Sequence, residues 1–139
     1  MSLWTGRTLS ALAIMFLVFD GAIKVMRHPM VLEASARLGF PPDGRAVVFT
    51  GALLLACTLL YAVPRTAIVG AVLLTGYLGG AVATQLRAGS PAFELVFPVI
   101  VGAVVWTGLV LQRAELAVYA RELVGISHGA DARNRVAVH

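Results

Sequence analysis

The sequence predicts an all-α protein: a bundle of four transmembrane helices with a short interfacial helix in the first loop. Composition is the first reason. Of the 139 residues, 59% are hydrophobic and only 13% are charged, whereas a soluble domain is about 45–50% apolar and roughly 25% charged. The second reason is that the apolar residues gather in four long runs. A soluble protein of this size needs a large polar surface, which so few charged residues cannot cover, whereas a protein whose surface faces lipid needs few charges.

Each of the four runs is long enough to cross a bilayer, for which roughly 20 mostly apolar residues are needed. The expected helices cover about residues 3–26, 46–63, 66–86 and 93–112. We expect the fourth helix to continue out of the membrane to about residue 124. The transmembrane domain would then span residues 1–125, followed by a disordered polar tail at 126–139.

The second and third helices are predicted to be antiparallel neighbours. As one helix, residues 46–86 would be ~61 Å long, about twice the hydrocarbon thickness of a bilayer. Pro64 and Arg65 mark the turn, because proline breaks a helix and arginine favours the headgroup region.

The first loop, residues 27–45, is long and should contain a helix of its own from Met30 to Leu38. Pro29 suits its first turn and Gly39 suits its C-terminal cap. We expect this helix to lie along the membrane interface over the mouth of the bundle.

Charge and cysteine content narrow the partners. The net charge is +4, but the basic residues are scattered at helix ends, so the lipid bilayer is the expected partner and nucleic acid is not. Their near-even distribution leaves orientation weakly set. We expect the inner or plasma membrane, with cytoplasmic termini because the basic tail has no apparent need to be exported. The single cysteine, Cys57, is interpreted as a small buried hydrophobe.

Three ionisable side chains fall inside the apolar zone, where they are costly and usually face a cavity or a partner: Asp20, Lys24 and Glu94. Asp20 and Lys24 share one helix face, and they either line a polar cavity or form a simple pair in which Lys24 extends to the interface. Glu94 lies in the first turn of the fourth helix. It is either an acidic residue stabilised by the helix dipole or a third member of a site with Asp20 and Lys24. With Tyr77 and Gln85, these residues form the candidate pocket.

A stripe of small residues follows one face of the third helix: Gly76, Gly80 and Thr84. Such a stripe allows another helix to pack closely. The packing helix can belong to this chain, to a partner protein or to a second copy, and the sequence leaves these open.

No reaction can be named from the sequence. No histidine lies in an apolar segment, so a haem ligand is missing there, and no cysteine and histidine cluster has zinc-ligand spacing. Phosphate-binding glycine-lysine and nucleophile-elbow motifs are also missing. We therefore expect no metal site, and whether the protein is an enzyme stays open.

Several motifs together resemble the DoxX-like family of small bacterial membrane proteins. The matching stretches lie within about residues 8–113: Phe19-Asp20-Gly21-Ala22-Ile23-Lys24, Leu38-Gly39-Phe40-Pro41, residues 75–87, Phe97-Pro98 and Val105-Trp106. The resemblance implies a four-helix bundle. Gln85 departs from the family pattern, in which histidine is more frequent, and this weighs against proton transfer there.

The resemblance also implies two roles. Some relatives are associated with quinone-linked sulfur oxidation or oxidative-stress complexes, so a quinone is the cofactor to consider and a membrane redox protein the partner. The alternative is a non-catalytic scaffold that docks a partner through the glycine-rich third helix. A proton or ion path ranks low, because the middle of the helices offers mainly threonine and glycine.

Overall fold

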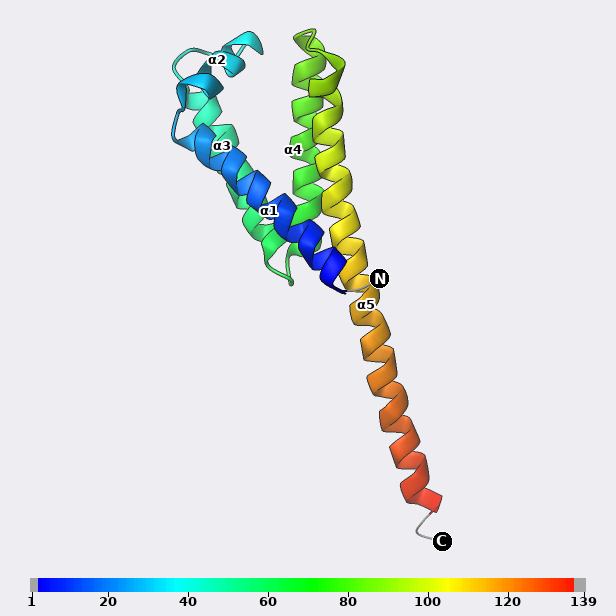
Figure 1. Ribbon diagram of the computed structural model, residues 1–139. Coiled ribbons are helices and arrows are strands. Elements are labelled where there is room, and N and C mark those ends of the chain that lie inside the picture. The colour runs from blue at the N-terminus through cyan, green and yellow to red at the C-terminus, as the bar shows by residue number, and fades with distance from the viewer. Residues whose placement is uncertain (1–2, 137–139) are drawn as a thin grey trace.

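The computed structural model describes residues 3–136, with continuous side-chain detail from Trp4 to Ala114, and this part of the chain is entirely helical apart from turns. The five helices are α1 (Leu3–Val25), α2 (Pro29–Arg37), α3 (Arg45–Ala62), α4 (Ala67–Arg87) and α5 (Ala92–Val136). α1, α3, α4 and α5 are long, and the short α2 lies at one end of the molecule (Figure 1). The predicted fold class, including the short helix in the first loop, is confirmed.

Four helical segments have the length and apolar character of membrane spans: Trp4–Val25, Arg45–Ala62, Ala67–Arg87 and Ala92–Ala114. Their surfaces support this assignment, because large apolar side chains such as Met15, Phe49 and Leu59 are each more than 60% exposed. In water such surfaces would aggregate, whereas lipid tails cover them without cost. The protein is therefore a multi-pass membrane protein.

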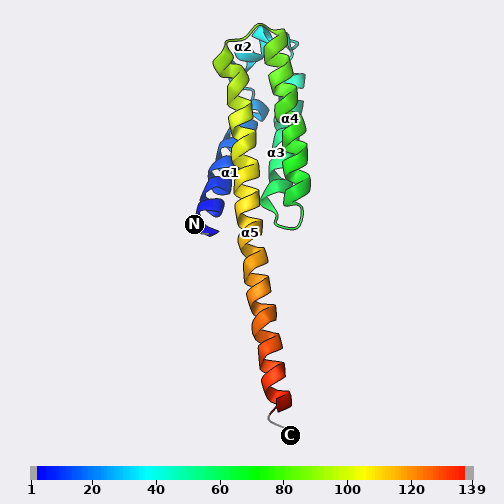
Figure 2. The ribbon, with the colours of Figure 1, turned by 90° about the vertical axis from the view of Figure 1, so that its right-hand side faces the viewer.

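The four spans form a closed ring in which each helix contacts two others. α1 packs against α3 and α5, and α4 packs against the same two helices, so α1 and α4 lie diagonally opposite each other. Figures 1 and 2 show this arrangement from two sides. A side chain that joins α1 to α4 must therefore cross the interior of the bundle.

Single glycines bring neighbouring helices together. A Cβ atom at Gly70 of α4 would overlap the backbone of Tyr61 on α3. At Gly108 of α5 it would lie 2.5 Å from the Ser10 hydroxyl of α1. Close backbone approach at small residues is the main way in which membrane helices gain packing energy, because lipid removes the hydrophobic drive between them.

The main cluster of buried apolar residues occupies one half of the bundle, the half next to the α3–α4 turn. Val47, near the start of α3, is also buried but lies outside this cluster. Leu17, Leu54, Leu74 and Val105 are at most 1% exposed and lie at the centre of the cluster. In α4 the buried residues end at Leu74, although the helix continues to Arg87. Toward α2, the α1–α3 pair diverges from the α4–α5 pair (Figure 1). We call these the packed half and the divergent half.

α2 forms as the sequence predicts, with proline in its first turn and a glycine after its end. His28 is the N-cap, and its Nδ1 accepts a hydrogen bond from the Met30 amide at 3.4 Å. Gly39 has φ +85°, which terminates the helix at low steric cost. The helix has no buried residue and lies near the ends of α1 and α3 (Figure 1).

The fourth span continues further than expected. We predicted a helix end near residue 124 and a disordered tail at 126–139, whereas α5 is helical to Val136; residues 137–139 lie outside the described part. Gly125 lies where we expected the helix to end. A glycine costs a helix only about 1 kcal/mol relative to alanine, and no proline follows it in the sequence, so the helix passes through.

Candidate functional site

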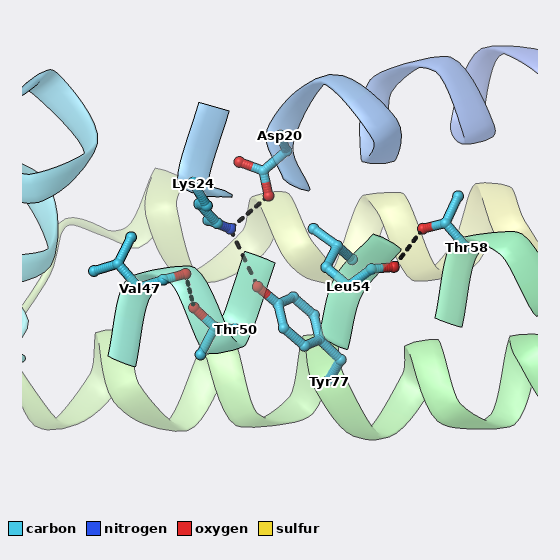
Figure 3. Close-up of polar contacts among 7 residues, drawn as sticks. All are labelled: Asp20, Lys24, Val47, Thr50, Leu54, Thr58 and Tyr77. Carbon is cyan, nitrogen blue, oxygen red and sulfur yellow. Dashed lines mark hydrogen bonds and ion pairs between the residues drawn. The ribbon is translucent and has the colours of Figure 1, made fainter. Parts of the chain in front are cut away.

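Three of the five predicted pocket residues meet in the interior of the bundle (Figure 3). The Lys24 Nζ lies 2.5 Å from Oδ2 of Asp20, one turn earlier on α1, and donates a second hydrogen bond of 3.2 Å to the hydroxyl of Tyr77 on α4. The ammonium also lies 5.6 Å from the centre of the Tyr77 ring. Lys24 therefore bridges the diagonal pair of helices.

Glycines on α1 and α3 direct Lys24 into the bundle. A Cβ atom at Gly51 of α3 would lie 2.7 Å from the Cβ of Lys24 and 2.9 Å from the Gly21 carbonyl oxygen. The α3 backbone therefore contacts the root of the lysine side chain. Because the α3 backbone occupies the space beside the Cβ of Lys24, the rest of the lysine side chain extends past α3 and reaches Tyr77.

The cluster is paired but remains accessible. The side chains of Lys24 and Asp20 are 22% and 30% exposed. Their mutual attraction offsets much of the cost of holding charge within a membrane span. Partial exposure means that another molecule can reach these polar atoms without unfolding a helix.

Hydrogen-bonding capacity is left over in the cluster. A lysine ammonium has three donors and a tyrosine hydroxyl has one. Lys24 uses two donors, on Asp20 and Tyr77, and Tyr77 accepts from Lys24. Among the hydrogen bonds of the described residues, none uses the third donor of Lys24 or the hydroxyl hydrogen of Tyr77. Two donors about 3 Å apart can therefore converge on one acceptor oxygen.

Gln85 and Glu94 lie elsewhere. The Gln85 side chain accepts a hydrogen bond of 2.6 Å from the hydroxyl of Ser90, in the α4–α5 turn. Glu94 is exposed in the first turn of α5. Tyr77 precedes Gln85 by about two helical turns, or ~12 Å, so Lys24 meets α4 near its middle rather than at its end.

The glycine stripe of α4 has no partner within the described chain. A Cβ atom at Gly76, Gly79 or Gly80 would meet nothing within 4 Å, and the Thr84 hydroxyl bonds back to the Gly80 carbonyl oxygen at 2.8 Å. Packing of another part of this chain against Gly76 and Gly80, one of the options left open by the sequence, is therefore not found. Gly76 and Gly80 therefore have open space beside them, and Thr84 lines a pocket opposite the loop after α2.

A second polar cluster, in the packed half, was not among the predicted site residues. Its members are Ser10, Tyr61 and Gln112, from α1, α3 and α5. The Tyr61 hydroxyl donates to the Val105 carbonyl oxygen at 2.9 Å and lies 2.9 Å from the Ser10 hydroxyl. The Gln112 amide donates to Ser10 at 2.7 Å. The available signal was a serine one turn after Gly6, within an apolar helix.

The described residues contain no group of three histidine, cysteine, aspartate or glutamate side chains that could hold a metal ion. An apolar groove of about 360 Å³ lies between α4 and α5. At one edge the Trp106 indole donates a hydrogen bond of 2.8 Å to the Thr75 hydroxyl. This contact is separate from both polar clusters.

Comparison with known proteins identifies a family match. The model of the DoxX-like family matches residues 8–108. No curated protein and no solved structure matches significantly. The matched range includes the whole Asp20, Lys24 and Tyr77 cluster.

Proposed function

Because the chain belongs to the DoxX-like family, we propose that it is a membrane subunit that binds the carbonyl-bearing head of a small amphipathic molecule at Asp20, Lys24 and Tyr77. A quinone fits this class. In this proposal the protein holds the quinone for a redox partner in the same membrane, and the chemistry of electron transfer belongs to that partner.

The observation that carries the proposal is the pair of unused donors on Lys24 and Tyr77. A quinone carbonyl is an acceptor without a hydrogen of its own, so it can take both donors at once. Its ring and isoprenoid tail are apolar and suit the lipid-facing surfaces of the spans. Asp20 holds the lysine ammonium in position through their 2.5 Å contact.

Quinone titration with matched variants tests this proposal. Decylubiquinone is titrated into the purified protein in detergent, and binding is measured by isothermal calorimetry. Tyr77→Phe and Lys24→Met each remove one donor, and each should weaken binding about tenfold, as expected for loss of a hydrogen bond with a charged or desolvated partner.

Thr50→Val is the matched control for this titration. Thr50 lies on α3 beside the cluster (Figure 3), but its hydroxyl is used by the Val47 carbonyl oxygen at 2.9 Å. Its replacement should leave quinone affinity within about twofold. Equal affinities for wild type, Tyr77→Phe and Lys24→Met would reject the proposed site.

A second candidate function, a scaffold, is favoured by the open glycines of α4. Gly76 and Gly80 have open space beside their backbone, where a helix of a partner protein, or of a second copy, could pack closely. Gly80→Leu would block this approach. If the scaffold role holds, that variant loses a partner that copurifies with wild type from native membranes, while decylubiquinone binding is unchanged.

We also propose that both termini of the chain face the cytoplasm, in the inner or plasma membrane. The basic residues of the α5 continuation support this orientation through the positive-inside tendency. Labelling of a cysteine introduced at Arg121 by a membrane-impermeant maleimide tests it. Labelling should occur in inverted vesicles and not in intact cells; the reverse pattern would overturn the orientation.

A further inference from the structure

A cavity of about 210 Å³ lies in the packed half, at the end of the bundle that carries the α3–α4 turn. It is lined by residues of α1, α3, α4 and α5 and by Pro64 of the turn. It lies far from the Asp20, Lys24 and Tyr77 cluster, because Ser10 and Lys24 are about 21 Å apart along α1. The quinone proposal makes no use of it.

The wall of this cavity contains ordered polar groups. Tyr61 donates to the Val105 carbonyl oxygen, so the Ser10 hydroxyl must donate to Tyr61. Ser10 in turn accepts from the Gln112 amide, which also donates to the Gly6 carbonyl oxygen at 3.1 Å. Both amide hydrogens of Gln112 are then used, and its side-chain oxygen is left as an acceptor among the hydrogen bonds of the described residues.

The charge around this cavity is positive. Arg7 lines it and is exposed. Arg65 follows Pro64 in the turn, and Arg113 follows Gln112 on α5; both are exposed. Ala11, Ile14 and Leu109 supply an apolar wall beside these groups. The combination of a cation, a free acceptor and an apolar wall suits an amphiphile that has a negative charge and a hydroxyl group.

Size favours part of a molecule rather than a whole one. Pockets for complete drug-sized ligands are about 300–1,000 Å³, and this cavity is smaller. A lipid headgroup needs less room, because its acyl chains stay in the bilayer. Basic pockets between membrane helices are known to bind anionic headgroups.

We propose that this cavity is a binding site for the headgroup of an anionic phospholipid, with Arg7 on the phosphodiester and the Gln112 oxygen accepting from a headgroup hydroxyl. Ser10 and Tyr61 are positioning residues, since they hold the Gln112 amide in place. Phosphatidylglycerol has both of the required groups, whereas phosphatidylcholine has no headgroup hydroxyl and no net charge.

Native mass spectrometry with competing lipids tests the site. The full chain in detergent is mixed with equal amounts of phosphatidylglycerol and phosphatidylcholine, and the retained lipid is quantified. Wild type should retain phosphatidylglycerol preferentially. Arg7→Gln should reduce that retention about tenfold, the effect of losing one charge-assisted contact. Because Arg7 is exposed, this substitution should leave folding unchanged.

Arg65→Gln is the matched control, because it removes an equal charge at the same end from a residue that does not line the cavity. It should change phosphatidylglycerol retention less than about twofold. Equal losses in the two variants, or equal retention of both lipids by wild type, would overturn the site. Displacement of phosphatidylglycerol by millimolar inorganic phosphate would also overturn it, by showing a simple anion site.

Discussion

The packed half and the divergent half of the bundle are built from the same four helices but use their polar residues differently. In the packed half, the polar groups of Ser10 and Tyr61 are buried and bonded to one another and to backbone. In the divergent half, Asp20 and Lys24 remain partly exposed, and Lys24 keeps an unused donor. Polar groups stabilise the bundle where the helices are in contact and stay available where they separate.

The largest test of this difference compares two glycines on α4. Gly70→Ala should destabilise the fold by about 3 kcal/mol, because the new methyl group has no space beside the Tyr61 backbone. Gly76→Ala meets nothing within 4 Å and should be neutral or stabilising by up to about 1 kcal/mol. Unfolding in mixed micelles, followed by circular dichroism, measures both. Similar losses would show that the halves do not differ in packing.

Removal of a hydroxyl from the packed half should have the next largest effect. Tyr61→Phe leaves the Ser10 hydroxyl without its acceptor and the Val105 carbonyl oxygen without the phenol. We expect a loss of about 1–2 kcal/mol in unfolding free energy, with decylubiquinone affinity unchanged. A fall in quinone affinity would mean that the two halves are coupled.

Removal of the charge of Asp20 should show the opposite pattern. Asp20→Asn keeps a hydrogen-bond acceptor for Lys24, so unfolding free energy should change by less than about 1 kcal/mol. Decylubiquinone binding should weaken about threefold to tenfold, because the lysine loses the partner that orients it. Wild-type values of both quantities would remove the support for a pocket at this position.

The smallest effect is expected at the edge of the α4–α5 groove. Thr75→Val deprives the Trp106 indole of its acceptor. Side-chain hydrogen bonds between membrane helices contribute about 0.6 kcal/mol on average. The indole should also show a blue-shifted emission, which fluorescence detects even if the stability change is too small to resolve. An unchanged emission spectrum in a Trp4→Phe background would contradict this hydrogen bond.

Much of the fold follows from the sequence, because hydrocarbon thickness dictates helix length and the 3.6-residue period places Asp20 and Lys24 on one face. The relative positions of residues on different helices along the membrane normal do not follow from the sequence. The candidate pocket grouped Lys24 with Gln85 and Glu94, which requires these residues to lie at one level in the membrane. Instead Lys24 meets α4 at Tyr77, about ten residues before the helix ends at Arg87.

The sequence also does not show which neighbouring helix each helix face contacts. Gly76 and Gly80 have the spacing of a packing motif, yet nothing lies within 4 Å of a Cβ atom placed there, whereas Gly51 and Gly70 lie where α3 closely approaches α1 and α4. A one-helix pattern shows that a backbone can be approached, but not by which neighbour. The end of α5 was missed for a different reason, since a lone Gly125 is a weak stop without a proline after it.

The length of α5 gives the bundle a lever. Its last 22 residues after Ala114 extend ~33 Å beyond the membrane span, as one helix with the segment that joins the packed half (Figures 1 and 2). A rotation of about 5° between the two helix pairs would move its tip by about 3 Å, if the helix turns as a rigid rod. A molecule that changes the angle between the helix pairs by binding at Lys24 and Tyr77 would therefore displace the end of α5 outside the membrane, without contacting it.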